Sequence, residues 1–214
     1  MGARAHPQAT STMTLEQKIK DGQITIGVIG LGYVGLPLAV EYAAKGYATI
    51  GVDVDSKKVA AINKGKNYID DVDSALLAQT VKQGALRAED HYKSVAQMDV
   101  IFICVPTPFT ETKDPDISYI INAAEGIALG LRKDHIIILK STTFPNTTEG
   151  YVQPILERGG KKVGKDFYLA FSPERIDPGN KVWNTANTPT VAGGVTKSCT
   201  KYAKLITELV IDNV

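Results

Sequence analysis

The fold class follows from residues 24–53, which read ITIGVIGLGYVGLPLAVEYAAKGYATIGVD. The pattern G-x-G-x-x-G, Gly30-Leu31-Gly32-Tyr33-Val34-Gly35, comes directly after the apolar run 24–29 and opens a helical pattern over 33–46. A second apolar run, 48–53, ends in Asp53, 23 residues after Gly30. This order and spacing are typical of a Rossmann βαβ unit that binds a dinucleotide.

Each position of the pattern has a physical reason. Gly30 permits the tight turn, Gly32 lets the backbone approach a pyrophosphate, and Gly35 lets the helix pack closely on the strand. A carboxylate at Asp53 can accept hydrogen bonds from ribose hydroxyls and would repel a 2′-phosphate. The sequence therefore predicts NAD rather than NADP as cofactor, although Lys57 and Lys58 lie close by and oppose this discrimination.

The rest of the chain alternates strand-length apolar runs with helical patterns. We expect strands over 99–105, 135–140, 167–172 and 189–192, and helices over 56–64, 74–83, 117–131, 147–158 and 196–209. Such alternation predicts an α/β fold with a doubly wound parallel sheet. We expect a tail and a leading helix over 1–22, followed by one NAD-binding domain over 23–214.

Composition excludes several classes of partner. Lys and Arg total 24 against 23 for Asp and Glu, so a net charge of +1 offers no basic surface for nucleic acid. No apolar run approaches the roughly 18 residues needed to cross a bilayer, and residues 1–13 do not read as a secretory signal. The two cysteines, the three scattered histidines and the missing zinc motifs predict a cytoplasmic protein without a metal site.

Three loops follow the later strands and carry polar chemistry. They are CVPTP at 104–108, KSTTFPNTT at 140–148 and FSPERIDPGN at 171–180. Because the carboxyl ends of parallel strands meet at one edge of a sheet, these loops should converge beside the glycine turn. Each loop alone could be turn chemistry, since Pro, Gly, Asn and Thr are common in turns.

Together with IGVIGLGYVGLPLA and the GVDVD stretch, these loops resemble the UDP-glucose/GDP-mannose 6-dehydrogenase family. The SPERIDPGN form is most similar to the branch that acts on UDP-N-acetylhexosamines such as UDP-N-acetylglucosamine. Two positions depart from the family pattern: Asn146 replaces a glycine, and Pro178 replaces a second glutamate found in the UDP-glucose branch. Asn tolerates the left-handed backbone region, so the turn can survive. Pro178 argues against UDP-glucose as substrate.

The resemblance implies roles for particular residues. The backbone of Gly32, Tyr33, Val34 and Gly35 would bind the pyrophosphate, and Asp53 the adenosine ribose, with Lys58 beside it. Pro106, Thr107 and Thr142 would line the cofactor site near the nicotinamide, and Thr142 would also belong to the catalytic set. Glu174 would act as the acid or base, and both Glu174 and Arg175 would contact the UDP-sugar substrate.

The resemblance also implies a cysteine nucleophile in a G-F-G-G-x-C stretch, because oxidation to a carboxylate passes through a covalent intermediate. That stretch is not in these 214 residues. We expect Cys104 to be a buried, inert thiol within a strand and Cys199 to be a surface thiol. The chain then reads as the amino-terminal part of a longer enzyme, truncated before its central helix and sugar-nucleotide domain. That full-length protein should be a homodimer or a higher homo-oligomer.

Other readings stay open at this point. The chain could be another Rossmann dehydrogenase, of the hydroxyacid or UDP-glucose type. It could also be a non-catalytic NAD-binding module, which the missing nucleophile would suit and which would have no need of Glu174.

Overall fold

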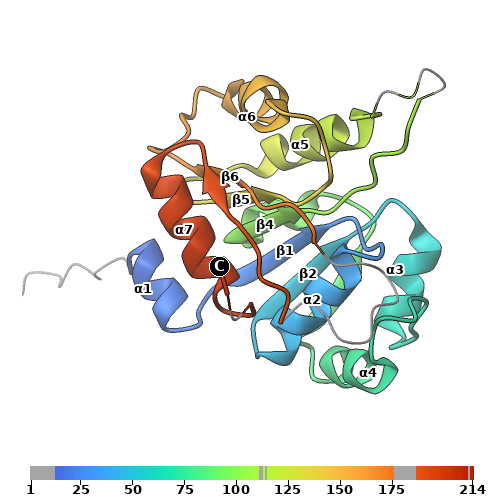
Figure 1. Ribbon diagram of the computed structural model, residues 1–214. Coiled ribbons are helices and arrows are strands. Elements are labelled where there is room, and N and C mark those ends of the chain that lie inside the picture. The colour runs from blue at the N-terminus through green and yellow to red at the C-terminus, as the bar shows by residue number, and fades with distance from the viewer. Residues whose placement is uncertain (1–12, 111–112, 114, 176–186, 212) are drawn as a thin grey trace, which may run out of the picture.

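The computed structural model describes residues 13–110, 113, 115–175, 187–211 and 213–214. A seven-stranded sheet in the order β3-β2-β1-β4-β5-β6-β7 forms its centre (Figure 1). The strands are β1 Thr25–Ile29, β2 Ala48–Val52, β3 Leu86–Glu89, β4 Val100–Ile103, β5 Ile136–Leu139, β6 Tyr168–Phe171 and β7 Gly193–Gly194. Six strands are parallel and β7 alone runs antiparallel, to β6. The predicted doubly wound α/β sheet is confirmed.

Helices cover both faces of this sheet. They are α1 Leu15–Lys20, α2 Gly35–Ala44, α3 Ser56–Asn63, α4 Ser74–Lys82, α5 Ser118–Gly130, α6 Gln153–Glu157 and α7 Lys197–Thr207. A short 3-10 helix, η1 Lys93–Gln97, precedes β4, and a π-helical turn, η2 Thr148–Val152, precedes α6. Helices α1, α2 and α7 lie on one face, and α5 and α6 on the other (Figure 1).

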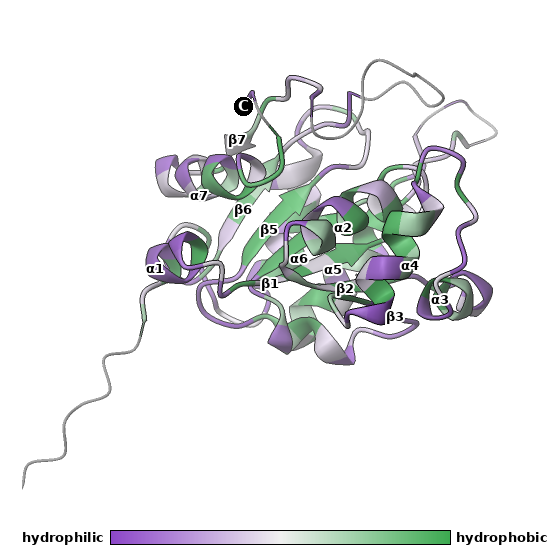
Figure 2. Cartoon of the chain, turned by 90° about the horizontal axis from the view of Figure 1, so that it is seen from below, coloured by the Kyte–Doolittle hydropathy of each residue, from purple (hydrophilic) through white to green (hydrophobic). Residues whose placement is uncertain are grey.

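The core accordingly has two halves, one on each face of the sheet. One half joins residues of α1, α2, α4 and α7 to one face of the strands, and the other joins α5, α6 and η1 to the opposite face. Apolar residues gather on the central strands and polar ones on the outer sides of α1, α3 and α7 (Figure 2). The central strands are buried on both sides, which is why β4 and β5 read as unbroken runs, VIFI and IIIL.

Three elements differ from the sequence-based expectation. Strand β3 was not predicted, and no strand lies at 189–192; the last strand is the glycine pair Gly193–Gly194. The helix expected over 147–158 begins as the π-helical turn η2 and becomes α-helical only at Gln153. Pro154 has no N–H to donate to the preceding turn, so regular α-helical hydrogen bonding is interrupted there.

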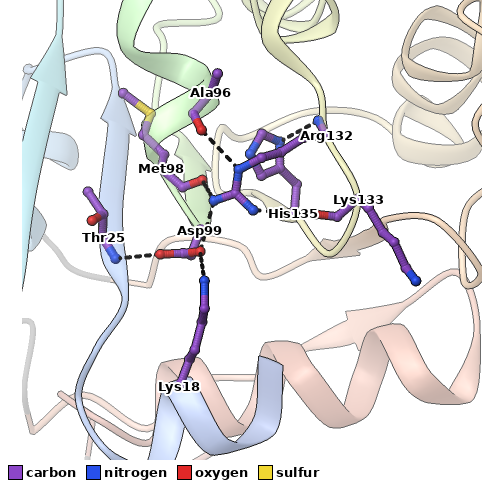
Figure 3. Close-up of polar contacts among 8 residues, drawn as sticks. All are labelled: Lys18, Thr25, Ala96, Met98, Asp99, Arg132, Lys133 and His135. Atoms are coloured by element: carbon purple, nitrogen blue, oxygen red, sulfur yellow. Dashed lines mark hydrogen bonds and ion pairs between the residues drawn. The ribbon is translucent and has the colours of Figure 1, made fainter. Parts of the chain in front are cut away.

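A polar cluster at the amino end of β4 ties distant segments together (Figure 3). Asp99 accepts hydrogen bonds from the Thr25 N–H at 2.9 Å and from Arg132 Nη2 at 2.8 Å, and Lys18 Nζ lies 3.5 Å away. Burial alone would raise the pKa of Asp99. These hydrogen bonds and the two cations outweigh it, so the pKa is lowered. Asp99 thereby links α1, β1, β4 and the turn after α5.

His135 lies beside this cluster, at the start of β5. Its Nδ1 accepts a hydrogen bond from the Arg132 N–H at 3.2 Å, and its ring is fully buried. Burial and then the charge of Arg132 lower the pKa of His135 from 6.5 to about 4. The imidazole is therefore neutral in the folded protein near pH 7.

Within the described segments, every helix is too short or too polar to span a lipid bilayer.

Candidate functional site

The glycine turn has the geometry that its sequence predicts. Gly30 adopts φ +91°, and a Cβ there would lie 2.7 Å from the carbonyl oxygen of Cys104. A Cβ on Gly35 would overlap the Gly30 carbonyl, so α2 can pack this closely only because Gly35 has no side chain. A Cβ on Gly32, by contrast, would meet nothing within 4 Å, because the turn faces open space there.

The amino terminus of α2 faces the same space. Side-chain oxygens cap α1, α3, α4 and α7, but Val34 at the start of α2 supplies no such cap. The first N–H groups of a helix have no intrahelical acceptor and form the positive end of its dipole. The end of α2 can therefore bind an anionic group in front of Gly32 and Tyr33.

Asp53 lies at the end of β2 and is buried, with 8% of its surface exposed. Its Oδ2 accepts the Leu31 N–H at 2.8 Å and its Oδ1 accepts the Asp55 N–H at 2.9 Å. Lys58 Nζ lies 3.5 Å from Oδ2. Oδ2 also accepts from Lys58 Nζ, but Oδ1 has a further lone pair, so Asp53 can still accept a ligand hydroxyl while it holds the glycine turn.

The loops after β4 and β5 converge, as expected. Thr107 donates its hydroxyl to the Thr142 carbonyl at 2.7 Å, and Ser141 donates its hydroxyl to the Val105 carbonyl at 2.7 Å. Asn146 adopts φ +71°, so the prediction that asparagine occupies the left-handed region of this turn is confirmed.

Lys140 is a site residue that the sequence analysis did not single out. It directly follows β5, and 4% of its side chain is exposed. Its Nζ lies 3.6 Å from Glu174 Oε2, in the loop after β6, and 3.5 Å from the Ser172 carbonyl. A lysine at the end of a fully apolar strand was a usable signal, because buried lysines are rare unless paired.

These groups surround one cavity of about 880 Å³. Of the residues that we associated with cofactor or catalysis, its wall contains Gly30, Gly32, Tyr33, Val34, Asp53, Lys58, Pro106, Thr107, Thr142 and Glu174. Gly35 lies behind the turn, and Arg175 is exposed outside the cavity wall, its N–H donating to Glu174 Oε1 at 2.8 Å. Residues 176–180 of the third loop, including Pro178, lie outside the described residues.

Aromatic and polar side chains between the motifs complete the wall. Tyr68, Tyr92, Tyr119 and Asn122 line the cavity although no motif indicates them. Tyr68 donates its hydroxyl to the Leu31 carbonyl at 2.7 Å, and burial raises the pKa of this phenol. Tyr68 thus binds the carbonyl of Leu31, whose N–H is held by Asp53.

Neither cysteine has the character of a nucleophile. Cys104 lies just beyond β4 in the cavity wall, and burial raises its pKa to about 12, so it stays a thiol. The prediction of a surface thiol at Cys199 is wrong: the side chain is fully buried, and its Sγ accepts the Leu169 N–H at 3.4 Å. The apolar face of α7 packs on β6 and carries Cys199 inward. Among the described residues, no group of three or more His, Cys, Asp or Glu side chains could hold a metal ion.

Comparison with known proteins identifies the family. Residues 24–210 match the model of the UDP-glucose/GDP-mannose dehydrogenase family, NAD binding domain. The chain belongs to this family. It is an NAD-binding Rossmann domain of the nucleotide-sugar dehydrogenases, as the motifs predict.

Individual relatives carry names of the same family. The UDP-N-acetyl-D-glucosamine 6-dehydrogenase of Pseudomonas aeruginosa is 35% identical over 81% of this chain and 40% of that protein. The UDP-N-acetyl-D-mannosamine dehydrogenase of Pyrococcus horikoshii is 33% identical over 84% of this chain and 43% of its own length. A solved structure of the Pyrococcus horikoshii enzyme superimposes with a TM-score of 0.83, at 31% identity, over 89% of this chain and 46% of that one. The chain thus spans less than half the length of these relatives.

Proposed function

We propose that this chain supplies the NAD-binding part of an enzyme that oxidises the C6 alcohol of a UDP-N-acetylhexosamine to the carboxylate. The product would be a precursor of a surface polysaccharide. The relatives with 33–35% identity carry names of this substrate class, which supports the choice. The observation that carries the proposal is that one cavity joins Asp53, the glycine turn and Glu174.

The residues of this cavity fit NAD. Asp53 lies at one end, where it can accept hydrogen bonds from the adenosine ribose while Lys58 stays beside it. The open space in front of Gly32 and the uncapped start of α2 suit a pyrophosphate. The nicotinamide would then lie beyond the ends of β4 and β5, beside Thr107 and Thr142. Bound there, NAD would accept a hydride in each of two successive oxidations.

The chain's own groups would position the substrate and move protons. Glu174 lies at the cavity wall beyond β6, where a carboxylate can accept a proton from the alcohol or from an attacking water. General acid–base catalysis of this kind contributes about 10²–10⁴-fold. Because Cys104 stays protonated and Cys199 is buried outside the cavity wall, neither supplies the thiolate that the reaction requires. The 214-residue chain alone should therefore bind NAD without producing NADH from a UDP-sugar.

Calorimetry on the purified chain tests this proposal. NAD should bind more tightly than NADP, and Asp53→Ala should weaken NAD binding by at least roughly 1–3 kcal/mol, because it removes the acceptor of the ribose hydroxyls and that of the Leu31 N–H. Lys57→Ala is the matched control, because Lys57 is exposed and lies outside the cavity wall. Equal affinities for NAD and NADP would refute the role given to Asp53. Steady NADH production with UDP-N-acetylglucosamine would refute the inactivity of the chain alone.

A further inference from the structure

The ammonium group of Lys140 lies buried at the carboxyl edge of the sheet. The Lys140 N–H donates to the Ile103 carbonyl at 2.9 Å, which fixes the backbone between β4 and β5. Its Nζ lies 3.5 Å from the Ser172 carbonyl and 3.6 Å from Glu174 Oε2. The ammonium therefore has a fixed place in the cavity wall.

Because the ammonium is buried, its electric field at neighbouring groups in the cavity is weakly screened. Only 4% of the Lys140 side chain and 15% of the Glu174 side chain are exposed, so water and salt screen the pair weakly. A buried charge without a counter-charge is costly, and Glu174 provides that counter-charge. Together the two groups add no net charge to this end of the cavity.

Cys104 shows that the two charges act in opposite directions on a neighbour. Burial raises the pKa of Cys104, while the charge of Lys140 lowers it and that of Glu174 raises it. A charged group placed in the same part of the cavity would experience the same two opposed fields. Removing either partner would change the balance of the two fields at this position.

We propose that the Lys140–Glu174 pair balances the affinity of the cavity for the oxidised and the reduced cofactor. This inference rests on the proposed function, which places the nicotinamide near Lys140 because Asp53 follows β2, separated from Lys140 after β5 by strands β1 and β4. The nicotinamide ring of NAD⁺ carries a positive charge and that of NADH does not. Lys140 thus opposes the oxidised ring, Glu174 attracts it, and together they prevent one redox state from blocking the site.

The test is the ratio of dissociation constants, Kd(NAD⁺)/Kd(NADH), measured by calorimetry on the 214-residue chain. Glu174→Gln removes the negative charge and keeps the ammonium, so it should raise the ratio; Lys140→Met removes the positive charge and keeps the carboxylate, so it should lower the ratio. Shifts of roughly threefold to tenfold are expected for a buried unit charge near the ring. The double variant should return to within about twofold of the wild-type ratio, because both charges of the pair are then absent.

Lys58→Met is the matched control. Lys58 forms a similar ion pair at 3.5 Å with Asp53, which follows β2 rather than β6. Its loss should therefore change the affinities for NAD⁺ and NADH equally, so that their ratio stays at the wild-type value. Equal ratios in wild type and Glu174→Gln would overturn the inference, as would shifts of the same sign in both single variants or an equal shift in Lys58→Met. If Lys140→Met does not fold by circular dichroism, Glu174→Gln alone decides. A wild-type chain that binds neither nucleotide would overturn the proposed function, and this inference with it.

Discussion

Replacing Asp99 by alanine should destabilise the fold without affecting cofactor binding. The variant removes the acceptor of the Thr25 N–H and of Arg132 Nη2. An orphaned donor and a lost charge-assisted hydrogen bond each cost about 1–3 kcal/mol, but Arg132 and Lys18 are 35% and 38% exposed and can turn to water. We therefore expect a loss of roughly 2–4 kcal/mol in the free energy of unfolding, which lowers Tm by about 5–15 °C for a chain of this size.

Urea unfolding followed by circular dichroism measures this loss, and calorimetry with NAD provides the second readout. Asp99 lies at the amino end of β4, away from the cavity wall, so the NAD affinity of the folded variant should be unchanged. Glu125→Ala is the control: Glu125 pairs with Arg158 at 3.1 Å, but both are exposed, and its loss should cost about 0.5 kcal/mol or less. An Asp99→Ala protein within about 0.5 kcal/mol of wild type would refute the reasoning.

Four further predictions follow from the backbone and from burial. Gly35→Ala should lower the free energy of unfolding by about 3 kcal/mol, because its Cβ would overlap the Gly30 carbonyl. Gly32→Ala should lower the free energy of unfolding in urea by about 1 kcal/mol or less, because its Cβ would meet no protein atom. The same Cβ would occupy the space in front of the turn, so NAD binding should weaken at least about tenfold in calorimetry. The folded-state pKa of His135 is lowered from 6.5 to about 4, so its contribution to stability is present above pH 6.5 and is lost as pH falls toward 4. Urea unfolding at pH 7 and pH 4.5 should differ by roughly 2–3 kcal/mol from this group, and His135→Asn should flatten that dependence. Asn146→Ala should lose about 1 kcal/mol at φ +71°, whereas Asn146→Gly should unfold at nearly the wild-type urea concentration.

The sequence allowed the central sheet to be predicted because its strands are buried on both sides. The consecutive apolar residues of β1, β4 and β5 can avoid water only if both faces of each strand are buried, as in a central strand of a parallel sheet. Strand β3 escaped prediction because Leu-Arg-Ala-Glu is a short edge strand with half its side chains toward solvent. The pair Gly193–Gly194 has no side chains to show a pattern; a Cβ on Gly194 would overlap the start of α7, so close packing explains that glycine.

The candidate site was predictable where local motifs define it. The glycine turn and Asp53 follow from spacing along one βαβ unit. The pairing of Lys140 with Glu174 joins residues 34 positions apart, and only the register of β5 against β6 brings them together. The burial of Cys199, by contrast, could have been predicted, because Cys199, Ala203 and Ile206 recur at helical spacing and form the apolar face of α7.

The hydrogen bond from the Leu31 N–H to Asp53 has a consequence for changing the cofactor. Engineering a Rossmann domain toward NADP starts by replacing the acidic residue at the end of the second strand, to admit a 2′-phosphate. Here the same carboxylate oxygen is the acceptor for an amide of the fully buried Leu31, at 2.8 Å. A neutral, shorter side chain at position 53 would admit the phosphate and at the same time release the turn that must bind the pyrophosphate. Cofactor exchange in this scaffold therefore requires a second substitution that supplies a new acceptor for that amide.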